Sequence, residues 1–83
     1  MKKPKIGSLV IIQNDYGDPL RARLPFVVKS YEKLMEGYYE EEIMILYPLI
    51  NSPPSNHWIY DYYKKHYFLL NSLWDAYIVQ VIE

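Results

Sequence analysis

The chain has 83 residues with a formal net charge of −1, and 51% of its residues are hydrophobic and 17% aromatic. A chain of this size has apolar surface for one core, so we expect a single domain over residues 1–83, with residues 1–4 flexible. The sequence contains no cysteine, which excludes a disulfide framework, a thiolate metal site and a cysteine nucleophile.

The first third of the chain predicts two strands separated by a long loop. Residues 6–13 alternate in a β-branched pattern typical of a strand. Residues 14–24 contain several turn-forming pairs and predict an irregular loop that includes Arg21 and Arg23. Residues 25–34 begin with a proline and alternate again, which indicates a second strand.

The middle of the chain predicts a turn, a third strand and a second loop. Gly37 marks the turn, and residues 39–49 alternate, so we expect the isoleucines to be buried and the glutamates to project into solvent. Pro48 and the polar, proline-containing segment 51–56 end this strand.

Residues 57–74 fit two structures. Spacings of three and four between Tyr60, Tyr63 and Tyr67 are typical of a helix, which would make the fold α+β with a helix in 57–70. Strict alternation from Trp58 to Tyr62 and a hairpin tip at Lys64-Lys65 favour strands, which we prefer. In the strand structure Trp58 is the expected core residue and Tyr63 the expected exposed one. Residues 71–74 predict a turn or one helical turn, and residues 77–82 a closing strand.

Charge is distributed unevenly along the sequence. Residues 1–35 hold seven lysines and arginines against three acids, whereas residues 36–63 hold five acids and no lysine or arginine. We expect folding to bring the two regions together, so that cross-strand ion pairs form on a solvated face.

Five to six short strands in about 80 residues predict an all-β protein. Residues 5–12, 25–31 and 71–82 resemble the first strand, the second strand, and the short turn with final strand of SH3-like barrels, including the small ones of bacteriophages. The resemblance implies a small SH3-like barrel that binds other molecules without catalysis, as in a phage accessory protein. The sequence Ile59-Tyr60-Asp61-Tyr62 also matches a signature of signalling SH3 domains, but it stands at a different place in the chain, so no peptide-binding residues are transferred from them.

Catalytic and metal-binding chemistry has little support in the sequence. His57, Asp61 and His66 are residue types that bind metals, but their spacing matches no metal-binding pattern. No serine lies in a nucleophile motif, and the adjacent glutamates are expected to be solvated. We therefore expect no enzyme, no metal and no cofactor.

The aromatic residues favour binding. Six of the fourteen aromatic side chains fall within residues 58–68, and a small barrel cannot bury all fourteen completely. We expect a protein partner bound through exposed tyrosines or a sheet edge, and edge pairing with a second copy would give a homodimer. The alternative is a single-stranded nucleic acid held by lysines and tyrosines. For either partner the candidate binding residues are Tyr60, Tyr62, Tyr63, Lys64, Lys65, Tyr67, Arg21 and Arg23.

The location of the protein follows from hydrophobicity alone. The longest apolar run near the start, residues 9–12, is too short for a signal-peptide core or a membrane span. We therefore expect a cytoplasmic protein without a membrane partner, in the host cytoplasm if the protein is viral.

Overall fold

Strands dominate the part of the chain that the computed structural model describes, which is residues 2–13, 23–50, 60–61 and 63–83. The elements in chain order are β1 (Leu9–Gln13), β2 (Arg23–Glu36), β3 (Tyr39–Pro48), β4 (Tyr60–Asp61), β5 (His66–Leu70), the 3₁₀ turn η1 (Asn71–Leu73), α1 (Trp74–Tyr77) and β6 (Ile78–Ile82). The predicted all-β fold is confirmed. Residues 14–22 of the loop predicted at 14–24, and the predicted loop at 51–56, lie outside the described residues. The loop prediction is wrong for Arg23 and Leu24, which belong to β2 because they pair with Gln13 and Ile12 of β1.

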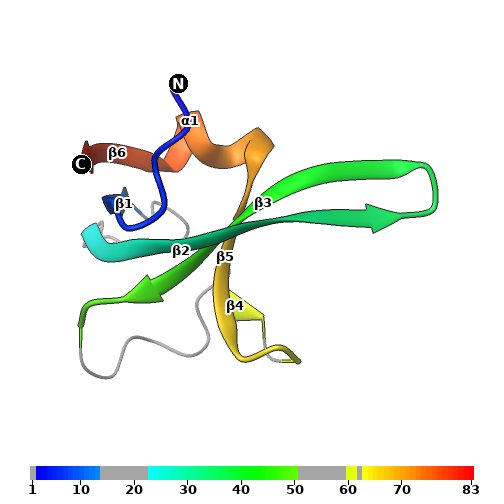
Figure 1. Ribbon diagram of the computed structural model, residues 1–83, viewed down its shortest axis with the longest axis horizontal. Helices are drawn as coiled ribbons and strands as arrows, with labels where there is room; N and C mark the ends of the chain where they lie inside the picture. The colour runs from blue at the N-terminus through cyan, green and yellow to red at the C-terminus, as the bar shows by residue number, and fades with distance from the viewer. Residues whose placement is uncertain (1, 14–22, 51–59, 62) are drawn as a thin grey trace.

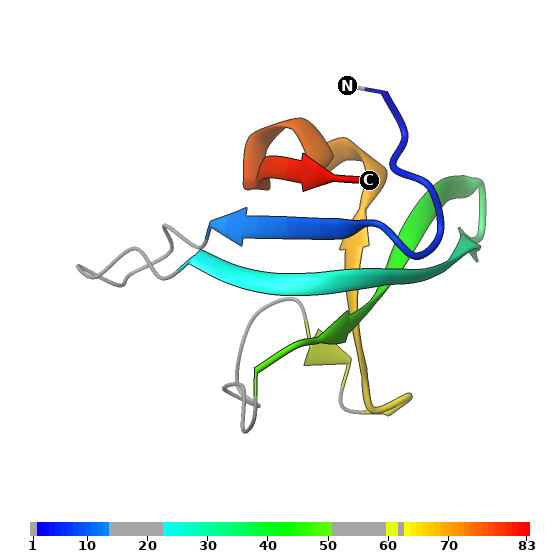
Figure 2. The same ribbon diagram turned by 60° about the vertical axis from the view of Figure 1, so that its left-hand side comes forward.

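The described strands form one antiparallel sheet in the order β4-β5-β3-β2-β1-β6. Figure 1 shows that β2 and β3 are long and strongly twisted, and Figure 2 shows β5 running across the direction of β1 and β2. The twist therefore folds the sheet over on itself, as the right-handed twist of strands allows. One face of the sheet is enclosed and becomes the core.

The core consists of alternating side chains from four strands and is closed by the C-terminal segment. Trp74 packs its ring edge-on against Tyr31, with ring centroids 5.7 Å apart, and its Nε1 donates to the carbonyl oxygen of Leu69 at 2.9 Å. Burial of these apolar side chains supplies the main driving force for folding. The buried cluster comprises Val10, Ile12, Phe26, Val28, Met44, Leu46, Tyr67, Leu69, Trp74 and Ile78.

Strand β3 departs from the predicted alternation. Residues 43–46 are all buried, so both faces of the strand are covered in this stretch. The reason is the position of β3 between β2 and β5: on the outer face Ile45 stands opposite Phe68, and Ile43 stands opposite Leu70. Directly opposed side chains share a face and cover one another.

Residues 60–70 form the predicted hairpin in the described positions. β4 pairs with β5, and a turn at 63–65 joins them, with Lys65 at a φ of 55°. For these residues the predicted strands are therefore confirmed, and the alternative helix is wrong. The predicted turn or helical turn at 71–74 is also confirmed, because η1 begins at Asn71 and leads into α1.

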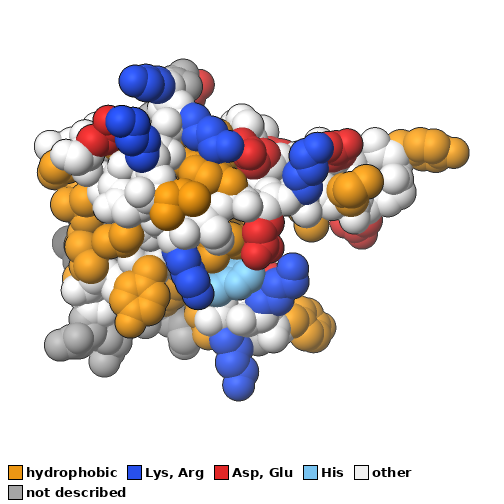
Figure 3. Space-filling model, in the orientation of Figure 1, with side chains coloured by type: hydrophobic (Ala, Val, Ile, Leu, Met, Phe, Trp, Pro, Cys, Tyr) orange, Lys and Arg blue, Asp and Glu red, His pale blue; other side chains and the backbone are white. Residues whose placement is uncertain are grey.

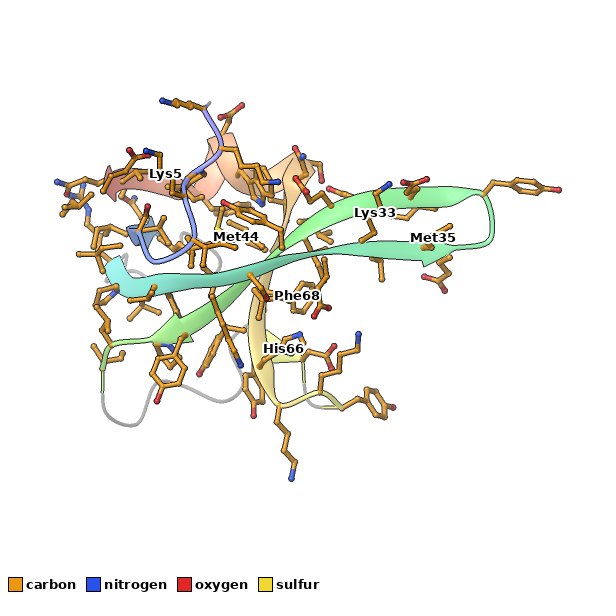
Figure 4. The ribbon with its side chains drawn as sticks, in the orientation of Figure 1. Lys5, Lys33, Met35, Met44, His66 and Phe68 are labelled. Atoms are coloured by element: carbon orange, nitrogen blue, oxygen red, sulfur yellow. The ribbon has the colours of Figure 1, made fainter. Side chains whose placement is uncertain are left out.

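The hairpin of β2 and β3 extends beyond the rest of the sheet. Ile43 is the first residue of β3 that pairs with β5, whereas β2 and β3 stay paired as far as Glu36 and Tyr39. Gly37 opens the connecting turn at a φ of 60°, a backbone conformation that glycine adopts without steric cost. We call residues 32–42 the arm; Figure 4 labels Lys33 and Met35 on it.

The N-terminal segment lies against the base of the arm. Pro4 is buried, and its carbonyl oxygen accepts a hydrogen bond from the Tyr31 hydroxyl. Lys3 forms an ion pair with Glu42 at 2.8 Å, and Lys33 forms one with Glu40 at 2.7 Å. The basic first part and the acidic middle of the sequence are thus brought together by ion pairs, as predicted.

Candidate functional site

A bulge in β2 places a lysine on the surface beside the end of β3. The register between β2 and β3 shifts between Val28 and Ser30, so Lys29 is an extra residue without a partner on β3. Bulges bend a strand and change the direction of a side chain. Lys29 is exposed and lines a cleft that begins at this bulge.

The turn between β4 and β5 positions the opposite side of the cleft. One carboxylate oxygen of Asp61 accepts the backbone N–H groups of Tyr63 at 2.9 Å and Lys64 at 3.1 Å. These bonds, that of Lys64 first, lower the pKa of Asp61, with a further contribution from the nearby His66 and Lys64 charges. Asp61 therefore fixes the turn that brings Lys65 and His66 to the cleft.

The cleft has a volume of about 440 Å³. We call it the tyrosine cleft; it is lined by Lys29, Leu46, Tyr47, Pro48, Tyr60, Lys65, His66 and Tyr67. Leu46 and Tyr67 are 2% and 5% exposed and belong to the core as well. Tyr60 packs its ring against that of Tyr67 with centroids 4.9 Å apart, and Tyr47, which is 63% exposed, stands at the rim.

The rim of the tyrosine cleft is basic. Lys29 and Lys65 are exposed, and neither forms an ion pair with any residue that the structure describes. Figure 3 shows the histidine on the surface with Lys or Arg side chains on both sides of it and an acidic side chain above it, and Figure 4 places His66 and Phe68 on β5. A cationic rim above an aromatic floor suits a ligand that combines negative charge with a flat or apolar group.

Three of the residues predicted from the sequence line this cleft, namely Tyr60, Lys65 and Tyr67. Tyr67 belongs to the core cluster, so it contributes the floor of the cleft.

The other predicted residues lie elsewhere. Tyr63 and Lys64 are in the adjoining turn, and the predicted exposure of Tyr63 is confirmed at 99%. Arg23 is exposed at the start of β2, opposite Gln13, and does not line the cleft. Arg21 and Tyr62, together with Trp58, lie outside the described residues.

Sequence reasoning missed Lys29 and Tyr47 and considered His66 only as a metal ligand. The alternation of residues 39–49 assigns Tyr47 to a face of its strand, but it does not reveal which other strands meet there. The bulge that exposes Lys29 is a feature of register between two strands, for which residues 25–34 contain no local signal.

Two other kinds of feature are absent from the described residues. No three histidine, aspartate or glutamate side chains come together there in a way that could hold a metal ion. The same part of the chain contains no helix with the length and apolar character needed to cross a membrane.

Compared with known proteins, the chain matches no family model, and neither the curated proteins nor the solved structures give a significant match.

Proposed function

We propose that the protein is a non-catalytic module that binds another protein through the tyrosine cleft. The cleft combines exposed Tyr47, half-buried Tyr60 and the lysines Lys29 and Lys65 around one apolar floor. Tyrosines serve as interface anchors because they offer much contact area at little cost in rotamer entropy. This gathering of tyrosines and lysines is the observation on which the proposal rests.

The charge of the rim specifies the kind of partner. Lys29 and Lys65 would attract a segment rich in glutamate or aspartate, and exposed charges of one sign raise the rate of encounter with such a segment. The tyrosine rings would then contact an aromatic or aliphatic side chain of the same segment. The proposed ligand is therefore an acidic peptide segment with one large apolar anchor.

We also propose a likeness to SH3-like barrels and a role as a phage accessory protein in the host cytoplasm; the end of the chain favours the barrel alone. The short turn η1 precedes the last strand, and β1 pairs with both β2 and β6. A small barrel that works by binding agrees with the tyrosine cleft.

The test is a titration of the ¹⁵N-labelled protein with a synthetic peptide of glutamates around a single tyrosine. We expect chemical-shift changes confined to the end of β3, the bulge in β2 and the β4–β5 turn. Lys29→Glu and Lys65→Glu each replace an attraction by a repulsion of similar size, so each is expected to weaken binding about 5- to 30-fold, equivalent to about 1–2 kcal/mol.

Lys5→Glu is the matched control, because Lys5 is an exposed lysine that does not line the cleft. It should leave the affinity unchanged. Equal weakening by Lys5→Glu would show that only net charge attracts the peptide, and the proposal would be refuted. Replacing the tyrosine of the peptide by alanine tests the anchor in the same way.

A single-stranded nucleic acid is a second candidate ligand, favoured by the same two lysines beside the packed rings of Tyr60 and Tyr67. Phosphate contacts give binding that weakens steeply with salt. A labelled oligothymidylate titrated at low and moderate salt tests it: salt-sensitive binding lost in Lys29→Glu and Lys65→Glu would favour the nucleic acid, and absence of binding at low salt would remove it.

A further inference from the structure

The tip of the arm exposes apolar side chains to solvent. Tyr38 is fully exposed at 110%, Met35 is 69% exposed and Tyr39 is 51% exposed. Met35 stands opposite Glu40, and Tyr39 stands opposite Glu36, so Met35 and Tyr39 lie on opposite faces of the ribbon. Large apolar side chains exposed at a protruding end are typical of a contact surface. We call these three residues the arm tip.

The arm is held in place at its base and along its length. Its strands are paired from Lys33 and Glu42 to the turn, and the Lys33–Glu40 ion pair of 2.7 Å joins them near the middle. At the base Glu41 accepts the backbone N–H of Ser72 at 2.6 Å. A two-stranded ribbon alone is marginally stable, so these contacts matter for presenting the tip at a fixed place.

The arm is acidic where the tyrosine cleft is basic. Residues 32–42 contain five glutamates and one lysine. Glu32 and Glu36 form no ion pair with any described residue, as is also true of Lys29 and Lys65 at the cleft. The arm thus has the composition proposed above for the ligand of the cleft: carboxylates beside an aromatic anchor.

The arm tip cannot reach the cleft of its own molecule. Tyr39 begins β3 and Tyr47, at the cleft rim, lies near its end, so a rise of about 3.3 Å per residue separates them by roughly 26 Å along one strand. Figure 1 shows the arm and the β4–β5 hairpin pointing away from the centre of the molecule in different directions. Contact between tip and cleft therefore requires two molecules.

We propose that the arm tip of one copy docks in the tyrosine cleft of a second copy, so that the protein associates head to tail. This inference rests on the proposed function, because it names the arm as an acidic, aromatic segment that the cleft accepts. Tyr38 and Met35 contact the tyrosine rings, and Glu36 lies near Lys29 and Lys65 of the second copy.

The arrangement determines the kind of assembly. Tip and cleft are different surfaces of one molecule, so every bound copy keeps one unused surface, and association continues into an open chain or closes as a ring. The contact is small, below the roughly 1,200 Å² of weak complexes, so we expect affinity in the micromolar range or weaker. It should weaken further as salt screens the charges.

Sedimentation velocity over a range of concentrations tests the inference with three full-length variants. Met35→Ser/Tyr38→Ser removes the tip, Lys29→Glu/Lys65→Glu reverses the cleft, and Ile6→Ser is the control, because Ile6 is 65% exposed but lies outside arm and cleft. All the altered side chains are exposed, and circular dichroism checks that each variant is folded.

The decisive measurement is a mixture of the first two variants. The tip variant keeps an intact cleft and the cleft variant keeps an intact tip, so each alone should be monomeric and the mixture should form a heterodimer and nothing larger. The wild type and Ile6→Ser should instead form longer species as the concentration rises.

Three results would overturn the inference. The first is a wild type that stays monomeric at every concentration. The second is a tip variant that self-associates as strongly as the wild type. The third is a mixture that stays monomeric although the wild type associates, which would indicate a symmetric contact between like surfaces. The glutamate–tyrosine peptide separates the two proposals: if it binds the cleft while the wild type stays monomeric, the proposed function stands and the head-to-tail contact fails.

Discussion

Tyr31→Phe tests how the N-terminal segment is attached to the sheet. The substitution removes the hydroxyl that donates to the Pro4 carbonyl oxygen. It leaves the ring in place, with the Lys3 ammonium 4.1 Å from its centroid and the edge of Trp74 against it. Any change in stability therefore reports the hydroxyl rather than the packing.

The expected loss at neutral pH is about 1–2 kcal/mol. A hydrogen bond contributes about 0.5–1.5 kcal/mol net, and the buried Pro4 carbonyl left without its donor adds to the loss. The change should appear as a lower free energy of unfolding, with an unchanged dependence on denaturant.

The pH dependence gives a sharper expectation. Burial, with a contribution from the charge of Glu42, raises the pKa of Tyr31 from 10.0 to about 12. Above about pH 10 the unfolded chain loses this proton while the folded protein keeps it, so the wild type loses stability as the pH rises toward 12. The full shift corresponds to roughly 3 kcal/mol, and solvent screening of this half-buried group reduces it to about 1 kcal/mol.

The stability gap between wild type and Tyr31→Phe should therefore be constant up to about pH 9 and narrow above about pH 10. Urea unfolding followed by tryptophan fluorescence measures this stability gap. Tyr47→Phe is the control because Tyr47 is exposed, and its unfolding free energy should stay within about 0.5 kcal/mol of the wild-type value at every pH. A difference in unfolding free energy that stays constant above about pH 10 would refute the assigned role of the hydroxyl.

Four further variants test individual contacts by urea unfolding. Trp74→Phe should cost about 1–3 kcal/mol, because it leaves the Leu69 carbonyl without the indole donor, and a loss below about 0.5 kcal/mol would contradict that bond. Lys65→Gly should stabilise the protein by up to about 1 kcal/mol, because glycine adopts a φ of 55° freely. Gly37→Ala should destabilise it by about 1 kcal/mol, because alanine is strained at a φ of 60° although the space around Gly37 is open. A destabilising Lys65→Gly together with a stabilising Gly37→Ala would refute this account of the turns. The pKa of Asp61 is lowered below 3.8 in the folded protein, so the ionised carboxylate stabilises the fold above that pH and this stabilisation is lost as the pH falls below it. Asp61→Asn should not show this loss of stability in acid. Identical dependence of stability on acid pH in the wild type and Asp61→Asn would contradict the role of Asp61 in the turn.

Local patterns in the sequence were sufficient for most strands. The alternation of residues 6–13 and 77–82 predicted β1 and β6, although the strands begin at Leu9 and Ile78, because Gly7 forms a turn and Tyr77 still belongs to α1. The prediction of these two strands depends on the side-chain period of a single strand, which the sequence contains in full. Tyr63 is exposed as predicted, but it lies in the β4–β5 turn, so the turn and not the period of a strand exposes it.

The candidate site needed contacts between distant segments. Lys29 reaches the cleft through a bulge in β2, Tyr47 through the end of β3, and Tyr60 and Lys65 through the hairpin that follows. The period of a strand shows which residues share a face but not how many strands lie beside it. For the same reason residues 43–46 were predicted to alternate and are instead all buried.

Residue patterns along the chain are sufficient to predict an all-β protein with more aromatic side chains than a small core can hold. Where the surplus lies depends on the packing of distant strands: Tyr67 lies under Tyr60 in the floor of the cleft, Tyr47 at its rim, and Tyr38 at the end of the arm. The physical reason is that burial depends on the register and twist that bring strands together, and these are set by the packing of the whole sheet.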